Sequence, residues 1–491
     1  TARGTLPTSH EKVPVVKDSR TARMPSQEPI PGPCDASARV RRNTLSRAMG
    51  AGLAGLMCGL DSGVIAGALN FSKEAFSADD RTLGWIVSSL MAAAAVGSVL
   101  AVFIADKWGR KGTLVVAGIL FLGGTALCSL APSVPIMVAG RVCLGLGVGL
   151  AAFAAPLYIA EIASQDRRGG LIASYQLMIT VGILLAFTSD SLLTPGGHWR
   201  IMFGVLAVPT ILFLMATLIL PYSPRWLMTK GRREEARTVL LTLRESAEIA
   251  DEELSRIDGQ LAQQETPGMA LLLSSSSFRR TFTLGIAMQM LQQFSGINIL
   301  MYYAPVVLSR MGFTATQSVW STTALGVVNT LATLVAVALM DRWGRRSLLS
   351  ISTFFSAVAM LGFGTLLWVG ATSLFASIAA MGCLILFIAA FAVGQGPLPW
   401  IICSEIQPIR GRTFAVSCST LASWIANWLV SNVFLSSMAV INDYGVFWCL
   451  AAFNLTFFIV GLLFVPETKG CSLEEIEQKI ASGVRLRDAG Q

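Results

Sequence analysis

The stretch Asp106–Lys111, which reads DKWGRK, returns in the second half of the chain as Asp341–Arg346, which reads DRWGRR. Each copy is a charged turn between two long apolar runs. Two further features recur in the same order, namely a pair of charged residues (Glu161 with Arg168, then Glu405 with Arg412) and a segment that begins with proline (Pro221–Arg225, then Pro466–Gly470). Three repeated features in one order indicate two duplicated halves.

The composition places both halves in a membrane. Of the 491 residues, 53% are hydrophobic and 13% are charged, whereas a soluble domain has about 25% charged residues. A helix that crosses a bilayer takes about 20 mostly apolar residues, so the hydrophobic residues suffice for about twelve such helices. We therefore predict an all-α membrane protein with twelve transmembrane helices, six in each half.

The apolar runs set the expected boundaries. They lie near 48–71, 83–105, 113–131, 134–160, 169–190 and 200–220, and again near 281–306, 316–340, 347–369, 374–404, 413–437 and 444–465. We predict a disordered tail over 1–46, a six-helix half over 47–221, a linker of short amphipathic helices over 222–280, a second six-helix half over 281–466 and a C-terminal tail over 467–491.

The charges indicate the orientation. The chain has 37 Lys and Arg residues against 29 Asp and Glu residues, a formal charge of +8. Most of the positive charge in the short loops falls on the side of the linker, and the positive-inside rule places that side in the cytosol. We expect a multi-pass protein of a plasma membrane with both tails and the linker in the cytosol.

Several classes of chemistry are excluded. The two histidines, His10 in the tail and His198 in a loop, provide neither a buried histidine base nor a His-based metal site. The nine cysteines contain no Cys-x-x-Cys pair, and most lie in apolar runs as small core residues. We expect no catalytic residue, no metal, no cofactor and no nucleic-acid partner, and a membrane enzyme is therefore disfavoured.

Asp61 is the only acidic residue that the predicted boundaries place deep within a span. A carboxylate at bilayer depth is costly and so indicates function. Asp61 lies about 20 Å from the linker side of the first span, and Arg141 lies about 10 Å into the fourth span from the opposite side, so the two depths nearly coincide. Such a pair is either a proton switch, in which protonation of Asp61 releases Arg141, or a static ion pair.

A group of amides lies on one face of the seventh span. Gln289, Gln292 and Gln293 are spaced i, i+3 and i+4, and Gln292 lies about 16 Å from the cytosolic end. Sugar hydroxyls require both donors and acceptors, and parallel repeats place a substrate site between the halves. These amides either bind a sugar or join helices by hydrogen bonds.

Other polar and aromatic residues lie at similar depths in other spans. From the sequence alone each one either contacts a substrate or packs the bundle: Gln176, Asn329, Trp400, Trp424 and Asn427. Trp400 follows a segment of two glycines and two prolines over 394–399, which must bend the tenth span.

The motifs together resemble those of the sugar porter family of the major facilitator superfamily, from about residue 48 to 480. The resemblance rests on the two repeated charged turns and on Pro221–Arg225, Gln292–Asn298, Gly396–Trp400 and Pro466–Gly470. On Gly59–Leu69 and Cys403–Pro408 the chain is most similar to bacterial proton-coupled members. Ala392, where facilitative animal members tend to carry Glu, also favours proton coupling, whereas Ser423 replaces a common Asn or Gln.

The resemblance implies a monomeric transporter of a bacterial inner membrane that carries a hexose, galactose or glucose, together with a proton by alternating access. It implies sugar contacts by Gln176, Gln292, Gln293, Asn298, Asn329, Trp400 and Asn427, and an outer gate formed by Tyr302 and Tyr303. It also favours a cytosolic latch, although the charges involved set the topology in any case: Asp106, Arg110, Glu161, Arg168, Asp341, Arg345, Glu405 and Arg412.

Three alternatives remain open. A passive hexose uniporter would carry Asp61 and Arg141 as a structural pair. A symporter for a pentose, arabinose or xylose, would share the same scaffold and proton site. A sugar sensor would require a long signalling tail, which the short C-terminal segment does not provide.

Overall fold

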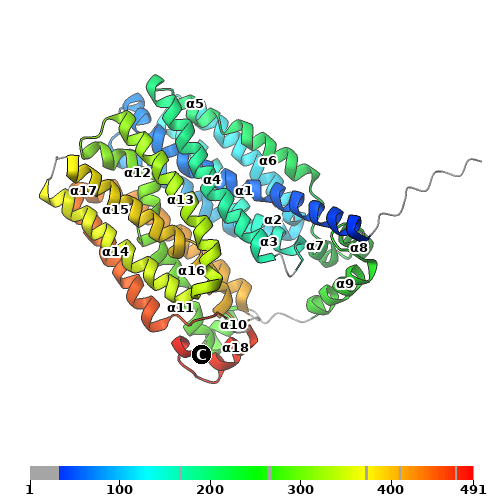
Figure 1. Ribbon diagram of the computed structural model, residues 1–491. Coiled ribbons are helices and arrows are strands. Elements are labelled where there is room, and N and C mark those ends of the chain that lie inside the picture. The colour runs from blue at the N-terminus through cyan, green and yellow to red at the C-terminus, as the bar shows by residue number, and fades with distance from the viewer. Residues whose placement is uncertain are drawn as a thin grey trace, which may run out of the picture.

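The structure is a computed structural model, and it describes residues 33–164, 168–262, 268–370, 374–408, 411–469 and 473–489. Within these ranges every regular element is a helix. Long helices lie side by side in two groups, and short helices gather at one end of the bundle (Figure 1). The predicted all-α fold is confirmed.

The two halves have matching elements. The first consists of α1 (Pro33–Phe76), α2 (Asp80–Ser129), α3 (Val134–Ile162), α4 (Arg168–Leu193), α5 (Trp199–Gly204) and α6 (Ala207–Ile219). The second consists of α11 (Ser276–Phe294), α12 (Ile297–Arg310), α13 (Ala315–Trp343), α14 (Arg345–Val369), α15 (Leu374–Ala390), the π-helical turn η3 (Phe391–Gln395), α16 (Leu398–Ile406) and α17 (Arg412–Phe464).

In the described part of the chain, nine helices are long and apolar enough to cross a membrane. Two of them each contain two spans, because α2 has non-helical backbone at Gly109 and α17 has it at Ile441 and Asn442. The helices α11 and α12 together form one further span that the nine do not include. The total of twelve spans agrees with the prediction.

Glycine determines the geometry of the two repeated charged turns. Gly109 has φ 75° and ψ 171°, and Gly344 has φ 84° and ψ 159°. This backbone region is essentially restricted to glycine. A Cβ atom at Gly344 would lie 2.5 Å from the Oε2 atom of Glu467, and one at Gly109 would lie 3.0 Å from the ring of Trp226. The repeated motif therefore encodes two sharp reversals between spans.

The seventh and tenth spans are interrupted near their middles. The break in the seventh is at Gly296, which has φ 97° and separates α11 from α12. In the tenth, η3 and Pro397 separate α15 from α16. Breaks of this kind free backbone carbonyls that must be satisfied inside the protein, and the bend that the sequence predicts in the tenth span is present.

Short helices form the linker, and we call the end of the bundle where they lie the linker face (Figure 1). They are α7 (Pro224–Thr229), α8 (Arg233–Leu241), α9 (Ala247–Ala262) and α10 (Gly268–Ser274). The buried Arg244 ties α8 and α9 to the first half, because its guanidinium donates to the carbonyls of Ile162 and Ala163 and to Glu253. The C-terminal α18 (Leu473–Ala481) lies at the same face (Figure 1).

The first helix begins earlier than predicted. The prediction of a disordered tail up to residue 46 is wrong for residues 33–46, which belong to α1. This extension contacts the linker through Asn43, which donates to the Thr242 carbonyl at 3.5 Å. Arg47, directly after the extension, donates to the Thr242 hydroxyl at 2.7 Å. Residues 1–32 of the predicted tail lie outside the described residues.

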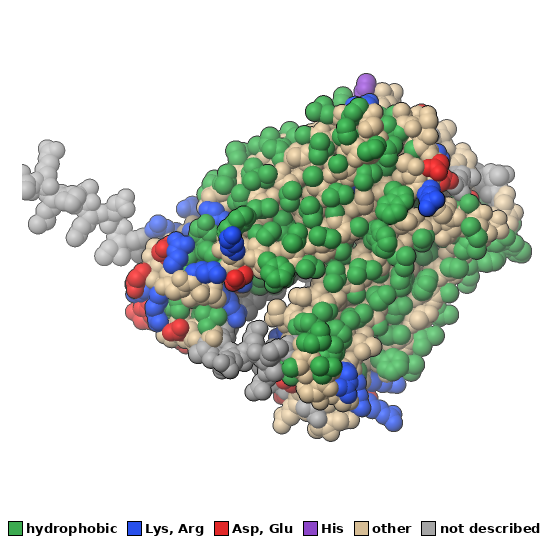
Figure 2. All heavy atoms as spheres, turned by 180° about the vertical axis from the view of Figure 1, so that it is seen from behind, with side chains coloured by type: hydrophobic (Ala, Val, Ile, Leu, Met, Phe, Trp, Pro, Cys, Tyr) green, Lys and Arg blue, Asp and Glu red, His purple; other side chains and the backbone are tan. Residues whose placement is uncertain are grey.

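The surface of the bundle is apolar over most of its height. Figure 2 shows hydrophobic side chains across the helices, with Lys, Arg, Asp and Glu gathered mainly at the end that carries the linker. Large apolar residues are strongly exposed on the outer surface of the bundle, among them Phe103, Ile219 and Phe375. Such a surface is stable in lipid and not in water.

Candidate functional site: the space between the halves

Asp61 on α1 and Arg141 on α3 form an ion pair inside the first half. The Nη1 atom of Arg141 lies 2.9 Å from the Oδ1 atom of Asp61, and both residues are fully buried. The Nε atom of Arg141 also donates to the carbonyl of Ile86 at 3.3 Å. Among the described residues, the Oδ2 atom of Asp61 and the Nη2 atom of Arg141 have no hydrogen-bond partner. The predicted pair is present, and it is not saturated with hydrogen bonds.

Tyr302 of α12 links this pair to the second half. Its side chain is 3% exposed and interacts electrostatically with both Asp61 and Arg141. Its hydroxyl points at the sulfur of Met91 on α2, at 4.0 Å. A residue of the second half therefore lies close enough to respond to the charge of the pair in the first.

The amides of the seventh span contact two other spans. The Nε2 atom of Gln293 donates to the Ser423 hydroxyl of α17 at 2.9 Å, and its Oε1 atom accepts from Asn298 at 2.6 Å. The Nε2 atom of Gln292 donates to the carbonyls of Gln395 and Gly396 at 2.7 and 2.8 Å. Gln292 thus satisfies carbonyls at the break in the tenth span, and the predicted group of amides does lie inside the bundle.

Two candidates offer polar atoms that have no partner. The Oε1 atom of Gln289 and the indole N–H of Trp424 are both buried and form no hydrogen bond with any residue that the structure describes. A buried polar group without a partner costs about 1–3 kcal/mol, so these two atoms can gain from a hydroxyl-bearing ligand.

The remaining candidates differ in exposure. Asn427 is 5% exposed and accepts from Ser431, and Asn329 is 6% exposed. Gln176 is half-buried, and Trp400 is 39% exposed. Hydrogen bonds join Gln293 to Gln292 and to Asn298. Within the described residues, this network does not include Gln176, Asn329, Trp400 or Asn427.

The halves touch at the end of the bundle opposite the linker, which we call the far face. Asn432 of α17 donates to the Ser88 hydroxyl of α2 at 2.9 Å, and the Ser191 hydroxyl of α4 lies 2.8 Å from the Thr323 hydroxyl of α13. Tyr303, the second predicted gate residue, is fully buried and donates to the carbonyl of Ser431. The far face is therefore closed.

At the linker face the predicted latch residues pair within each half. Arg110 lies 2.9 Å from Glu161, and Arg345 lies 3.7 Å from Glu405. Asp106 pairs with Lys230 at 3.5 Å, and Arg412 donates to the carbonyl of Gln407. The side chains of Arg168 and Asp341 lie outside the described part of the structure. The surface is hollowed between the two halves at this face (Figure 2).

Two buried polar residues of the interior, Asp190 and Asn454, were not predicted from the sequence. Asp190, three residues before the end of α4, is also fully buried, so Asp61 is not the only acidic residue enclosed by the bundle. The predicted fifth run ended at residue 190, whereas α4 continues to Leu193 and is followed by a short 3-10 turn over 194–196. Asn454 was also missed, although it is a single amide within an apolar run; it accepts from Gln395 and donates to the carbonyl of Ser295.

The architecture defines a class of protein. Twelve spans in two similar halves, closed at one face and hollowed at the other, with unpaired polar groups buried between them, are typical of a secondary transporter. Comparisons with known proteins identify the family. Residues 48–480 match the family model described as "Sugar (and other) transporter", and the chain therefore belongs to this family of multi-pass membrane transporters.

Among characterised relatives, the galactose-proton symporter of Escherichia coli K12 is 44% identical over 90% of this chain and 95% of its own length. The arabinose-proton symporter of the same strain is 41% identical over 92% of this chain and 96% of its own. Among solved structures, the xylose transporter XylE of E. coli in a partially occluded inward-open conformation has a TM-score of 0.76 at 28% identity, covering 87% of this chain and 99% of the other.

Proposed function

We propose that this protein imports a hexose, galactose or glucose, together with a proton across a bacterial inner membrane. The observation that carries the proposal is the buried Asp61–Arg141 pair beside the contact between the halves. It is supported by 44% identity to a galactose-proton symporter over nearly the whole chain. The protein works as a monomer, without a cofactor.

The linker face is the cytosolic face, because the basic turns and the linker lie there. In this orientation the closed far face is the outer one, and the conformation is open toward the cytosol. Tyr302 and Tyr303 are the outer gate in its closed state, since both are buried under the far face. Opening to the outside requires the Asn432–Ser88 and Ser191–Thr323 contacts to break.

Asp61 is the proton carrier. A proton that enters from the outside binds the Asp61 carboxylate, which ends the ion pair and frees Arg141. Protonation replaces the buried ion pair by a neutral carboxyl and an Arg141 cation, and this change of charge alters the relative energies of the two conformations. Release of the proton to the cytosol restores the pair. Tyr302 lies within electrostatic reach of both charges and so couples the protonation of Asp61 to the gate.

Sugar binds between the halves against α11, α12 and α17. A sugar hydroxyl replaces the Gln293–Ser423 and Gln293–Asn298 bonds, and others engage the unpaired atoms of Gln289 and Trp424. Trp400 presents an exposed ring for the C–H face of the sugar. The oxygen of Gln292 binds sugar while its nitrogen holds the tenth span. Asn427 of α17 also faces the sugar, and Gln176 and Asn329 complete the site from the fifth and eighth spans.

The charged groups at the cytosolic face form the latch. In the inward-open state Arg110–Glu161 and Arg345–Glu405 are pairs within one half. When the cytosolic face closes, these groups exchange partners across the halves, together with Asp106, Arg168, Asp341 and Arg412. Both pairs are largely shielded from solvent, with side-chain exposures of 18% and 5% in the first and 19% and 23% in the second. Breaking such a pair without replacing it leaves a poorly solvated charge, so the exchange of partners is what allows the face to close.

Transport in sealed vesicles tests the proposal. The protein is reconstituted without a pH gradient, galactose or glucose is added outside, and the external pH is recorded. Symport predicts an alkalinisation that requires sugar. Sugar entry without a change in pH would identify a passive uniporter instead, with Asp61 and Arg141 as a structural pair.

A pentose symporter is the second candidate, and the 41% identity to an arabinose-proton symporter favours it. The same assay separates the two candidates. Alkalinisation with arabinose or xylose but not with a hexose would reassign the substrate and leave the proton site unchanged.

A further inference from the structure

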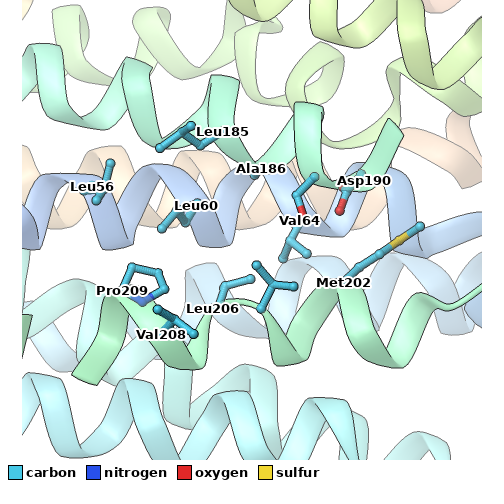
Figure 3. A pocket seen from close by; sticks show the side chains of 12 residues that line it. Leu56, Leu60, Val64, Leu185, Ala186, Asp190, Met202, Leu206, Val208 and Pro209 are labelled. Atoms are coloured by element: carbon cyan, nitrogen blue, oxygen red, sulfur yellow. The ribbon is translucent and has the colours of Figure 1, made fainter. Parts of the chain in front are cut away.

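A cavity of about 400 Å³ lies inside the first half, between α1, α4, α5 and α6 (Figure 3). Its volume falls in the range of small-molecule sites. Leu60 and Val64 of α1 form its buried floor. Leu185 and Val208 at its rim are 49% and 64% exposed on the apolar outer surface. The cavity therefore opens toward lipid and not toward the space between the halves.

One acidic group lines this otherwise mostly apolar cavity. Asp190 is fully buried, and Figure 3 shows its side chain directed from α4 toward α1 and Val64. Its Oδ2 atom accepts from the Gly67 amide at 3.2 Å, and its Oδ1 atom has no hydrogen-bond partner. Within the described residues, the Gly67 amide is the one hydrogen-bond partner of this carboxyl. Unlike Asp61, Asp190 has no cation beside it in the described part of the chain.

We propose that this cavity binds an amphipathic amine that reaches it from the bilayer. The Oδ1 atom of Asp190 is buried in the cavity wall, so binding requires a small movement of the lining side chains that exposes it. The ammonium group then donates to Oδ1 while the Oδ2 atom remains bonded to Gly67, and the alkyl body occupies the apolar cavity. Charge complementarity selects an amine, because a carboxyl enclosed by apolar side chains gains more from a cationic donor than from a neutral one.

The site is separate from the proposed sugar path. Asp190 lies 14 residues along α4 from Gln176, or about 21 Å along the helix axis, and Leu185 lies on the side of the helix opposite Gln176. All the residues that line the cavity belong to the first half. The proposal therefore does not depend on the transported substrate or on proton coupling.

Binding of a matched pair of probes tests this inference. The full-length protein is placed in phosphatidylcholine nanodiscs and titrated with radiolabelled decylamine or decanol, with protein-free nanodiscs as background. We expect saturable binding of decylamine, at least about tenfold tighter than that of decanol, because a hydrogen bond to a charged group contributes about 1.5–3 kcal/mol.

Three variants locate the site. We expect Asp190→Asn to remove the preference for decylamine over decanol, and Val208→Trp at the rim to weaken the binding of both probes. The control variant Glu74→Gln neutralises an exposed acid at the end of α1 and should leave the affinity for both probes unchanged. Thermal unfolding checks that each variant is folded. Equal binding of the two probes, binding that Asp190→Asn or Val208→Trp does not alter, or a signal no greater than that of empty nanodiscs would each overturn the proposal.

Discussion

Replacing Asp61 by Asn is the sharpest test of proton coupling. The substitution keeps an oxygen near the Nη1 atom of Arg141, which now lies 2.9 Å from the Oδ1 atom, but it removes the group that can gain and lose a proton. We expect Asp61→Asn to bind and exchange sugar across the membrane and to lose accumulation against a gradient.

The size of both effects follows from the geometry. One pH unit corresponds to about 1.4 kcal/mol, so a symporter that moves one proton per sugar reaches about tenfold accumulation under that gradient, and an uncoupled variant reaches about onefold. Arg141 is fully buried, and loss of its partner leaves an uncompensated charge that costs about 3–5 kcal/mol. The amide oxygen favours the lower end of that range. Arg141→Gln in the same chain should recover most of this loss.

The assay uses sealed proteoliposomes with an imposed gradient of one pH unit, acid outside, and measures the internal and external sugar at steady state. Counterflow of labelled sugar without a gradient reports exchange. Asp190→Asn is the matched control, because Asp190 is equally buried in the same half but has no cation partner. Accumulation that persists in Asp61→Asn, or that is lost equally in Asp190→Asn, would refute the assignment of Asp61 as the proton carrier.

Three further predictions follow from single contacts. Gln293→Ala removes the amide that bonds Ser423 and Asn298, and we expect the dissociation constant for sugar, measured by equilibrium binding, to rise about 5- to 100-fold; an unchanged constant would make Gln293 a packing residue. Gly109→Ala places a side chain at φ 75° against Trp226 and should cost about 1–3 kcal/mol of stability in thermal unfolding, whereas Gly170→Ala, at a helical position with open space, should cost nothing. Asn432→Ala removes a bond between the halves at the far face and should increase labelling of cysteines placed near that face by an impermeant reagent; unchanged labelling would show that this contact does not hold the far face closed.

Local patterns in the sequence predicted much of the fold, because the bilayer imposes length and composition on each span. The depth of Asp61 and Arg141 along their spans followed from residue counts alone, and the pair is present. The repeated glycine of the charged turns has the conformation that explains its recurrence, since both Gly109 and Gly344 adopt backbone angles that other residues rarely reach.

Contacts between distant segments could not be predicted in the same way. The nitrogen of Gln292 is bonded to carbonyls of the tenth span, more than a hundred residues away, which no helical spacing reveals. Asn43 and Arg47 of α1 bond to Thr242 in the linker, a contact between distant segments that no local pattern reveals. The missed Asp190 reflects a span boundary, because a carboxyl at the edge of an apolar run gives no sign of being enclosed by three other helices.

The two buried carboxyls also show why burial alone does not identify a coupling site. Asp61 lies on α1, Asp190 accepts a hydrogen bond from the Gly67 amide of α1, and both carboxyls are fully buried. Of the two, only Asp61 faces a cation within the described structure, and that cation lies beside a residue of the other half. A change of charge at Asp61 therefore alters an interaction between the halves, whereas a change at Asp190 alters a cavity within one half. Coupling requires the first arrangement, because a proton can drive a movement only if its binding changes the relative energies of the two conformations.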